Sequence, residues 1–449
     1  MKLYFRTEKK YIAFFLLIFS LYFSTGCNFH EGNRKENFYQ CGRFICRGDY
    51  KILLRGVNIS HTAKRTIIPW VGENEIKILR EKWGLNFIRL TVFWAAVEPE
   101  RDKYNRNYIN SLKEIIEIAR KYEIYVLVDS HQDIFGFRAT DSDEGDGPPE
   151  WARDETCPEF QNLKPWMLNY ISPAIMCQFD SFWQDKNGVQ TSYIKMLGFL
   201  AKEFDEYENI IGFEIMNEPW PGTSFLNTEK WENETLREFY KKAINEIRKF
   251  SNKLIFYETH PLSDFGWNFY LVKPEGENLV YAPHIYPLPD ELMGVSGINK
   301  GLKEVFLMHL EHSLKYDVPM IIGEYGSSWE DEKAYDKIME HINLFDSNFV
   351  GSAIWAYDKA SKYSLGIVDD FLNPMTNFLP VIRPYPELVK GTMQKLEYHY
   401  HPDGEKEMEF ILDGEEFILS CPKIFRCYIN GEEIKDMKIT QKEGKIKWE

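Results

Sequence analysis

The run GFEIMNEP, residues 212–219, places the carboxylate of Glu218 directly after a short apolar segment that predicts a strand. A second run, IIGEYG at residues 321–326, places Glu324 in the same way. A charged group at the end of a buried strand is costly unless the site uses it. The two runs therefore predict a pair of catalytic acids that two strands carry to one cleft.

Between residues 50 and 358, short apolar segments alternate with amphipathic segments of helical period. The predicted strands are Ile52–Val57, Phe87–Val92, Tyr125–Ser130, Gly212–Asn217, Leu254–Glu258, Leu279–Ile285, Met320–Glu324 and Ser352–Tyr357. The predicted helices are Asn74–Trp83, Tyr108–Tyr122, Thr191–Tyr207, Lys230–Lys249, Lys300–Lys315 and Lys333–Phe345. Eight strands with intervening helices indicate a (β/α)8 TIM barrel in the α/β class. An open doubly wound sheet is the alternative, but no glycine-rich phosphate loop follows the first strand.

Polar residues follow the predicted strands repeatedly, and in a barrel the chemistry lies at the carboxyl ends of the strands. These strand-end residues are Asn58, Arg89, His131, Glu218, His260, His284, Glu324 and Trp355. Their shared position predicts one active site at that end of the barrel.

The chain divides into four predicted parts. Residues 1–27 combine a basic start with an apolar run and small residues, which is typical of an export signal. The ending Thr25-Gly26-Cys27 resembles a bacterial lipoprotein signal, so both secretion and a lipid anchor at the cell surface are open. We expect a tether at 28–49, the catalytic barrel at 50–384 and a C-terminal all-β, sandwich-like domain at 385–449, where short strand patterns are separated by Asp-Gly, Asn-Gly and Glu-Gly turns.

The cysteines agree with export. Besides Cys27, six cysteines form three sequence-local pairs, for which we expect disulfides although the connectivity does not follow from sequence: 41/46, 157/177 and 421/427. The second pair lies in an unusually long connection, from Asp133 to Gln190, that is rich in aromatic residues. This connection is expected to form a wall or lid over the barrel mouth, or a surface loop with a small core of its own.

The composition argues against nucleic-acid binding, because the formal net charge is −15 and no Lys/Arg-rich stretch is long enough to follow a phosphate backbone. Aromatic residues make up 16% of the chain, as expected where flat rings stack on sugar faces, although a heavily aromatic core would give the same share.

Two carboxyl groups on one cleft suit the retaining cleavage of a glycosidic bond, in which one acid protonates the leaving oxygen and the other attacks the anomeric carbon. Glu218 beside Asn217 suits the proton donor, whose pKa must be raised. Glu324 suits the nucleophile if Arg89 and Tyr286 donate hydrogen bonds that keep it ionised.

A metal site is the alternative for the histidines. His131 and His284 could ligate an ion together with Asp129 or Asp133. The segment His131-Gln132-Asp133 lacks the His-x-His spacing that metal-dependent barrel hydrolases usually show on one strand. We therefore predict no metal and no cofactor.

The segment 212–220 with Asn217-Glu218-Pro219, together with His284-Ile285-Tyr286, Gly323-Glu324-Tyr325-Gly326 and Trp355, resembles glycoside hydrolase family 5. Arg89 and His131 complete the usual set of that family, and the likeness covers residues 50–358. The resemblance implies that Glu218 is the acid/base, that Glu324 is the nucleophile and that Trp355 lies under the sugar at the cleavage point.

Three segments narrow the resemblance to the endoglycoceramidases of this family, which release the intact glycan from ceramide in glycosphingolipids: Gly56-Val57-Asn58 followed by Lys64, Asp129–Asp133, and Glu214–Trp220. By this resemblance Lys64, Asp129 and Asp133 contact glycan hydroxyls, and the substrate implies contact with a membrane surface. We expect an apolar wall for the lipid from residues in the loops after the sixth and seventh strands, namely Leu288, Leu292, Met293, Val295 and Trp329. The alternatives are another family 5 enzyme, either a β-glucosyl lipid hydrolase or a β-glucanase, and a catalytically silent barrel that binds glycans at the cell surface.

Overall fold

The computed structural model describes residues 37–59, 62, 64, 67–136, 147–164, 166–287, 300–360, 365–400 and 404–449. The predicted export signal, and all of the proposed lipid-contacting residues except Trp329, lie outside this range. Among the described residues, no helix has both the length and the apolar character that a membrane crossing requires.

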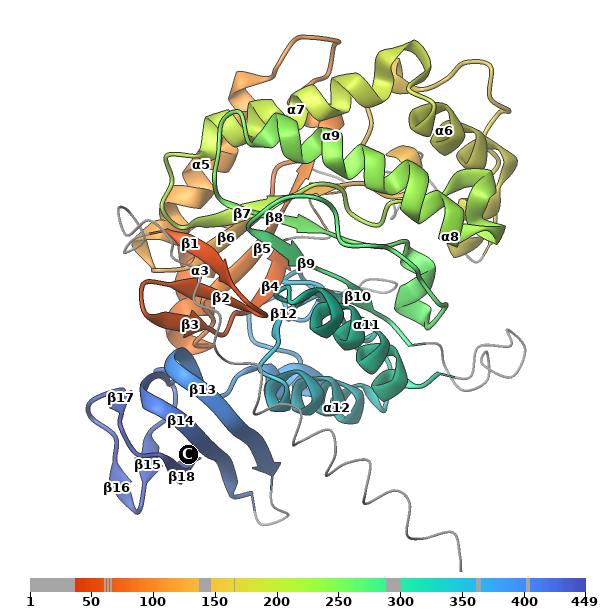
Figure 1. Cartoon of the computed structure of the whole chain (residues 1–449). Helices are drawn as coiled ribbons and strands as arrows, with labels where there is room; N and C mark the ends of the chain where they lie inside the picture. Colours follow the sequence, from red (N-terminus) through yellow and green to blue (C-terminus); the bar gives the residue numbers. More distant parts are fainter. Residues whose placement is uncertain are drawn as a thin grey trace, which may run out of the picture. The chain divides into compact units, whose positions relative to one another are not determined.

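A parallel sheet forms the centre of the chain, in the spatial order β10-β11-β12-β4-β5-β6-β7-β8-β9 (Figure 1). Its strands are β4 (Arg55–Ile59), β5 (Phe87–Phe93), β6 (Tyr125–His131), β7 (Ile210–Glu214), β8 (Leu254–Tyr257), β9 (Leu279–Tyr281), β10 (His284–Ile285), β11 (Ile321–Tyr325) and β12 (Gly351–Ile354). The two end strands, β9 and β10, are one predicted strand that is interrupted at Ala282-Pro283. Because this single segment pairs with β8 on one side and β11 on the other, the sheet closes on itself, and the predicted eight-stave barrel is confirmed.

Helices lie outside the strands, as the (β/α)8 pattern requires (Figure 1). They are α3 (Glu73–Lys77), α4 (Trp94–Val97), α5 (Arg106–Lys121), α6 (Pro173–Trp183), α7 (Val189–Phe204), α8 (Thr228–Lys230), α9 (Arg237–Ile247), α11 (Leu302–Tyr316) and α12 (Ala334–Ser347). Helix α5 shows why the pattern predicts them. Its N-cap Asn105 accepts the backbone N–H of Tyr108, and its apolar stripe is buried against the barrel.

A glycine begins the β7 motif for a steric reason. A Cβ atom at Gly212 would lie 2.1 Å from the backbone oxygen of Leu254 in the neighbouring strand β8. Only glycine permits this close approach. The approach brings the segment that follows β7, which carries Glu218, alongside the end of β8.

The long connection after β6 contains its own helix, α6, so it is more than a loop. Ser172 caps α6 and Pro173 occupies its first turn, while Phe179 and Phe182 are buried in the barrel core cluster. The disulfide between Cys157 and Cys177 ties the connection to α6. The connection therefore packs on the barrel core through α6, a helix that we did not predict from the sequence.

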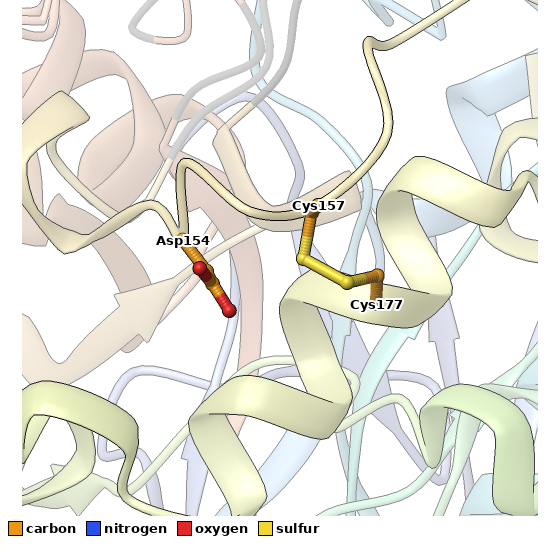
Figure 2. A group of neighbouring side chains, drawn as sticks. All are labelled: Asp154, Cys157 and Cys177. Carbon is orange, nitrogen blue, oxygen red and sulfur yellow. A yellow bond between two sulfur atoms is a disulfide. The ribbon is translucent and has the colours of Figure 1, made fainter.

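The three predicted cysteine pairs form the disulfides Cys41–Cys46, Cys157–Cys177 and Cys421–Cys427. The second of these lies beside Asp154 (Figure 2). Asp154 accepts hydrogen bonds from the Ser181 hydroxyl and from the Lys186 ammonium group. Because the sulfur atoms of Cys157 and Cys177 are bonded to each other, these two cysteines and Asp154 offer no thiolate to a metal.

The prediction of a tether at 28–49 is wrong for its described part, because Phe38–Cys41 and Phe44–Arg47 are strands. Strands β1 (Phe38–Cys41), β2 (Phe44–Arg47) and β3 (Tyr50–Ile52) form an antiparallel meander. Phe38 and Ile45 belong to the same buried cluster as the interior side chains Phe87 and Leu127 of the barrel strands. The hairpin therefore covers the amino-terminal end of the barrel, and its alternating polar residues hid this role in the sequence.

The C-terminal segment forms a second, antiparallel sheet that the N-terminal strands join. Its strands are β13 (Tyr385–Tyr400), β14 (Lys406–Ser420), β15 (Cys427–Ile429), β16 (Glu432–Glu433), β17 (Lys438–Ile439) and β18 (Glu443–Trp448), in the order β1-β2-β3-β13-β14-β18-β15-β16 with β17 beside β14. The turn predicted at Asp413-Gly414 is wrong, because β14 runs through it. Gly414 lies opposite Gly391, where the register shifts at a bulge and there is no space for a side chain.

Candidate active site

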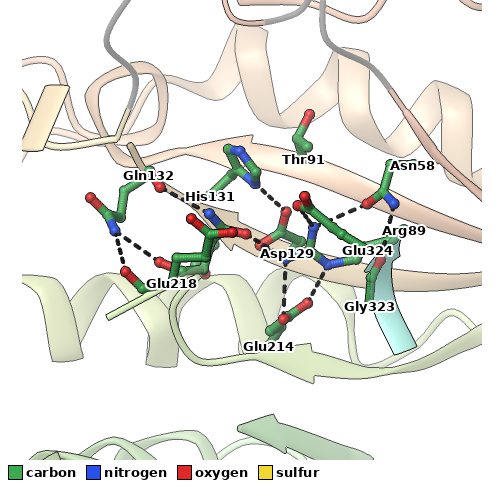
Figure 3. Close-up of polar contacts among 12 residues, drawn as sticks. Asn58, Arg89, Thr91, Asp129, His131, Gln132, Glu214, Glu218, Gly323 and Glu324 are labelled. Atoms are coloured by element: carbon green, nitrogen blue, oxygen red, sulfur yellow. Dashed lines mark hydrogen bonds and ion pairs between the residues drawn. The ribbon is translucent and has the colours of Figure 1, made fainter. Parts of the chain in front are cut away.

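The backbone around Glu218 is held in an unusual conformation. Strand β7 ends at Glu214, so Asn217 and Glu218 lie in the connection that follows, where the sequence predicted strand up to Asn217. Glu218 has a φ of 44°, a left-handed value that is uncommon for a residue with a side chain. The Gln132 side chain donates hydrogen bonds to the backbone oxygens of Asn217 and Glu218, at 2.9 and 3.0 Å (Figure 3). The loop is thereby fixed to the end of β6.

Glu324 lies in β11 and receives hydrogen bonds from both predicted donors. Arg89 Nη1 is 2.7 Å from Oε1, and the Tyr286 hydroxyl is 3.1 Å from Oε2. Only 5% of Glu324 is exposed. Charged and hydroxyl donors favour the ionised form of a carboxyl group, which is the form a nucleophile needs.

Arg89 lies inside the barrel, where the sequence predicted a strand-end position. It is the third residue of β5 and is fully buried. Its guanidinium group contacts both Glu214 oxygens, at 2.6 and 3.1 Å, and Asp129 at 3.1 Å, in addition to Glu324 (Figure 3). One cation therefore serves several carboxylates from different strands.

His284 lies between the two predicted catalytic acids. Its Nδ1 is 2.9 Å from Glu218 Oε1 and 3.7 Å from Glu324 Oε2. The three groups offer one atom each within 4.8 Å of one another, so the two carboxyl groups face each other closely. This close approach suits a retaining glycosidase, in which the carboxyl groups are about 5 Å apart.

Burial changes the pKa values of two groups at the centre of the site, Glu218 and His284. It raises the pKa of Glu218 to about 7, with the charge of Asp133 acting in the same direction. Burial also lowers the pKa of His284 to about 4, so this imidazole is neutral at pH 7. Glu218 can therefore hold a proton near neutral pH, as a proton donor must.

A second group of predicted residues lies beside the acids. His131 Nδ1 is 2.7 Å from Asp129 Oδ2, and its Nε2 is 3.7 Å from Asp133 Oδ2. Asp133 forms an ion pair with Lys64. Trp355 stacks on the His131 ring at a centroid distance of 5.2 Å, and the Lys64 ammonium group is 4.9 Å from the Trp355 ring. Acceptors, a donor and a flat ring together suit the hydroxyls and the face of a sugar.

The structure brings all eleven predicted site residues into one connected set of contacts. The set contains Lys64, Arg89, Asp129, His131, Asp133, Asn217, Glu218, His284, Tyr286, Glu324 and Trp355. Their roles in catalysis and binding remain predictions.

Sequence reasoning assigned no role to four residues of this site. Glu214 ends the buried strand β7 and Glu258 directly follows the buried strand β8, so the signal that identified Glu324 also marks them. Gln132 holds the Glu218 loop. Tyr170, from the α6 connection, donates its hydroxyl to Asp133 Oδ1 at 3.1 Å, which no local pattern could reveal.

The metal alternative required both histidines to share an ion. In the described part of the chain, His284 lies near Glu214 and Glu258 and near Glu218 and Glu324, but His131 joins no group of potential ligands close enough to share an ion. The side chains of His131 and His284 are therefore arranged around separate carboxylates.

The chain is similar to known proteins over most of its length. The family model described as "Cellulase (glycosyl hydrolase family 5)" matches residues 48–361. Endoglycoceramidase I from Rhodococcus hoagii is 24% identical over 367 residues, which cover 76% of this chain and 70% of that protein. Endoglycoceramidase from Hydra vulgaris is 25% identical over 331 residues, which cover 62% of each chain.

Solved structures show the same fold. Endo-glycoceramidase II from a Rhodococcus species, in its ganglioside GM3 complex, aligns with a TM-score of 0.73 at 20% identity, over 89% of this chain and 97% of that chain. A lactosyl-enzyme intermediate of that protein aligns with the same values. With the family model covering the whole barrel and the paired glutamates in place, the chain belongs to glycosyl hydrolase family 5.

Proposed function

We propose that this protein is a retaining endo-β-glycosidase that hydrolyses the bond between the oligosaccharide and the ceramide of glycosphingolipids. The observation that carries the proposal is the approach of Glu218 and Glu324 within 4.8 Å around His284. Relatives named endoglycoceramidase supply the substrate class.

In the first step, an ionised Glu324 oxygen attacks the anomeric carbon while protonated Glu218 gives its proton to the ceramide oxygen. Ceramide leaves as an alcohol, and the glycan remains bound to Glu324 as an ester. In the second step, Glu218 takes a proton from a water molecule, whose oxygen attacks the same carbon and releases Glu324. Two inversions leave the configuration of the sugar unchanged.

Lys64, Asp133 and Tyr170 supply the proposed contacts to the glycan. The Lys64–Asp133 ion pair lies next to His131 and Trp355, and the Tyr170 hydroxyl donates to the same aspartate. Carboxylates accept hydrogen bonds from sugar diols, and an ammonium group donates them. A site with several such groups suits more than one sugar residue, which favours release of a whole glycan.

Contact with a membrane surface is part of the proposal. The short helix η4 (Trp166–Ile171) carries Tyr170 on its inner side, whereas Met167, Leu168 and Ile171 are each at least 39% exposed. The η6 helix (Gly222–Leu226), which packs against η4, ends at Leu226 with 80% exposure. Exposed apolar residues beside the site suit insertion among lipids, since the formal net charge of −15 gives no attraction to an anionic bilayer. Export, by secretion or with a lipid anchor, would bring the enzyme to such surfaces.

Incubation with ganglioside GM3 and product analysis by mass spectrometry tests the function. We expect free ceramide together with the intact trisaccharide, and no product from the Glu324→Gln variant. Release of single sugars would identify an exo-enzyme. Binding of the glycolipid by the wild type without any product would identify a catalytically silent glycan-binding protein.

A second candidate is a hydrolase of simple β-glucosyl lipids. Glucosylceramidase from Rhizopus delemar is 26% identical over 233 residues, or 38% of this chain. Glucosylceramide and lactosylceramide, offered separately, distinguish the two functions. Cleavage of glucosylceramide alone would favour the second candidate.

A further inference from the structure

Glu258, the residue directly after strand β8, is a buried acid that lies against Glu218 and His284. It is 2% exposed. The hydroxyl of Tyr240, on α9, accepts the backbone N–H of Glu258 at 3.2 Å and donates to its backbone oxygen at 2.7 Å. The position of this residue is therefore fixed from the outside of the barrel.

The Glu258 side chain reaches the backbone of Glu218. Its Oε2 lies 3.3 Å from the Glu218 backbone N–H, which donates to it. On the other side of the same residue, the backbone oxygen of Glu218 accepts from the Gln132 side chain. Side chains from the ends of β6 and β8 thus hold both peptide groups of Glu218, whose left-handed φ of 44° would otherwise be unfavourable.

Glu258 also flanks His284. The imidazole Nδ1 faces Glu218 Oε1 at 2.9 Å, and its Nε2 faces Glu258 Oε1 at 3.6 Å. The ring therefore lies between two carboxyl groups. A Cβ atom at Gly323 would lie 3.1 Å from His284 Nε2, so the ring has little room to move.

Arg89 cannot neutralise Glu258 by a hydrogen bond. All five N–H groups of its guanidinium are directed to other acceptors, namely both oxygens of Glu214, Asn58, Asn217 and Glu324. The nearest Glu258 oxygen is 3.8 Å from Arg89 Nη2. Burial and the neighbouring charge of Glu214 raise the pKa of Glu258 well above its usual value. This shift favours the neutral carboxylic acid form of Glu258.

We propose that Glu258 is a positioning residue for the proton donor: it accepts the backbone N–H of Glu218 and, through His284, fixes the direction of the Glu218 carboxyl group. This role rests on the proposed assignment of Glu218 as the acid/base. A neutral acceptor is sufficient for it, so glutamine can replace Glu258 whereas alanine cannot.

Two lactosides with the same glycan test the role without depending on ceramide. A dinitrophenyl leaving group departs without protonation, whereas an alkyl leaving group needs the proton of Glu218. For Glu258→Ala we expect kcat/KM to fall roughly 30- to 100-fold with the alkyl lactoside, since a misplaced catalytic group costs about this much, and less than about threefold with the dinitrophenyl lactoside. Glu258→Gln should recover most of the loss.

Glu232→Ala is the matched control. Glu232 is a second buried carboxyl group whose pKa burial raises to about 7, but its partners are Thr259 and the backbone of Tyr270. We expect this variant to change kcat/KM for both lactosides by the same factor, because the contacts of Glu232 are with Thr259, Tyr270 and His260 and not with the proton donor.

Equal losses with both lactosides in Glu258→Ala would show a structural role alone and overturn the proposal. So would a Glu258→Gln variant as defective as Glu258→Ala. If Glu258→Ala lacks a cooperative melting transition, Glu258→Asp replaces it, because the shorter side chain withdraws the acceptor and keeps the acid. Hydrolysis of the lactosides without any hydrolysis of GM3 would reject the proposed substrate and leave this test intact.

Discussion

Two buried arginine clusters, one around Arg55 at the amino-terminal end of the barrel and one around Arg89 inside it, show what distinguishes a reactive ionic cluster from a structural one. At the amino-terminal end, Arg55 and Arg383 share the single carboxylate of Asp346. Inside the barrel, the single cation Arg89 serves Asp129, Glu214 and Glu324. The first cluster has surplus positive charge and the second has surplus negative charge.

The two clusters accommodate their surplus charge differently. Arg55 donates to the backbone oxygens of Leu54 and Val350, so neutral dipoles complete its environment. Burial, followed by the charge of Arg383, lowers the pKa of Arg55 to about 9. Burial also acts to lower the pKa of Arg89, but the charges of Asp129, Glu214 and Glu324 raise it well above its usual value.

The consequence is chemical. The Arg55 cluster has no carboxylate left without a cation, and it links β4 to α12 and the segment before β13. The Arg89 cluster leaves Glu218 and Glu258 without a hydrogen bond to the arginine, and Glu218 can therefore carry a proton to a substrate. Four substitutions or conditions test this contrast.

The largest effect is expected for Glu324→Gln, which removes the proposed nucleophile. We expect kcat to fall roughly 10⁴- to 10⁶-fold, the range found when a catalytic nucleophile is removed. Steady-state hydrolysis of an aryl β-lactoside measures it, and circular dichroism should show an intact fold, because Arg89 retains its other carboxylates. Retention of more than a few per cent of the wild-type activity would remove Glu324 from the nucleophile role.

Glu218→Gln should reveal the proton donor by its dependence on the leaving group. With an alkyl lactoside or a glycolipid, we expect kcat/KM to fall roughly 10²- to 10⁴-fold, the usual contribution of a general acid. With a dinitrophenyl lactoside, the first step should be almost unchanged. Equal losses with the two leaving groups would contradict the assignment.

Asp346→Ala should affect stability and spare the chemistry. It leaves Arg55 and Arg383 buried without their shared anion, and removal of one partner from a buried ion pair costs about 3–5 kcal/mol. Urea unfolding measures the loss, while kcat per folded molecule should match the wild type. A large loss of kcat in the folded variant would mean that the two clusters are coupled.

The smallest effect is expected when only the pH is changed, because this alters the protonation of Glu218 and leaves every side chain in place. Because the proton donor must be protonated and the pKa of Glu218 is raised to about 7, kcat/KM for an alkyl lactoside should be highest below that pH and fall about tenfold per pH unit above it. The dinitrophenyl lactoside should lack this alkaline decline. An identical decline for both substrates would assign it to another group.

The sequence alone was sufficient to predict the barrel and the shared location of Glu218 and Glu324. Strands and helices were predictable because the apolar period changes between the strand and helix patterns along 50–358, and because a carboxylate at a strand end is a strong signal when the strand is buried. The cysteine pairs were predictable because their partners are close in sequence. The position of a carboxylate at a strand end does not, however, show that Glu324 is the nucleophile and that Glu214 or Glu258 is not.

Which acids are neutralised and which can react depends on contacts that form only in the folded chain. That outcome depends on Arg89, whose five donors are distributed among residues from β4, β7 and β11 and the loop after β7. The pairing of strands β1–β3 with β13 over the barrel, and the contact of Tyr170 with Asp133, are also visible only in the folded chain. Such contacts join residues far apart in the chain, and their energy depends on burial and distance, which local sequence patterns do not encode.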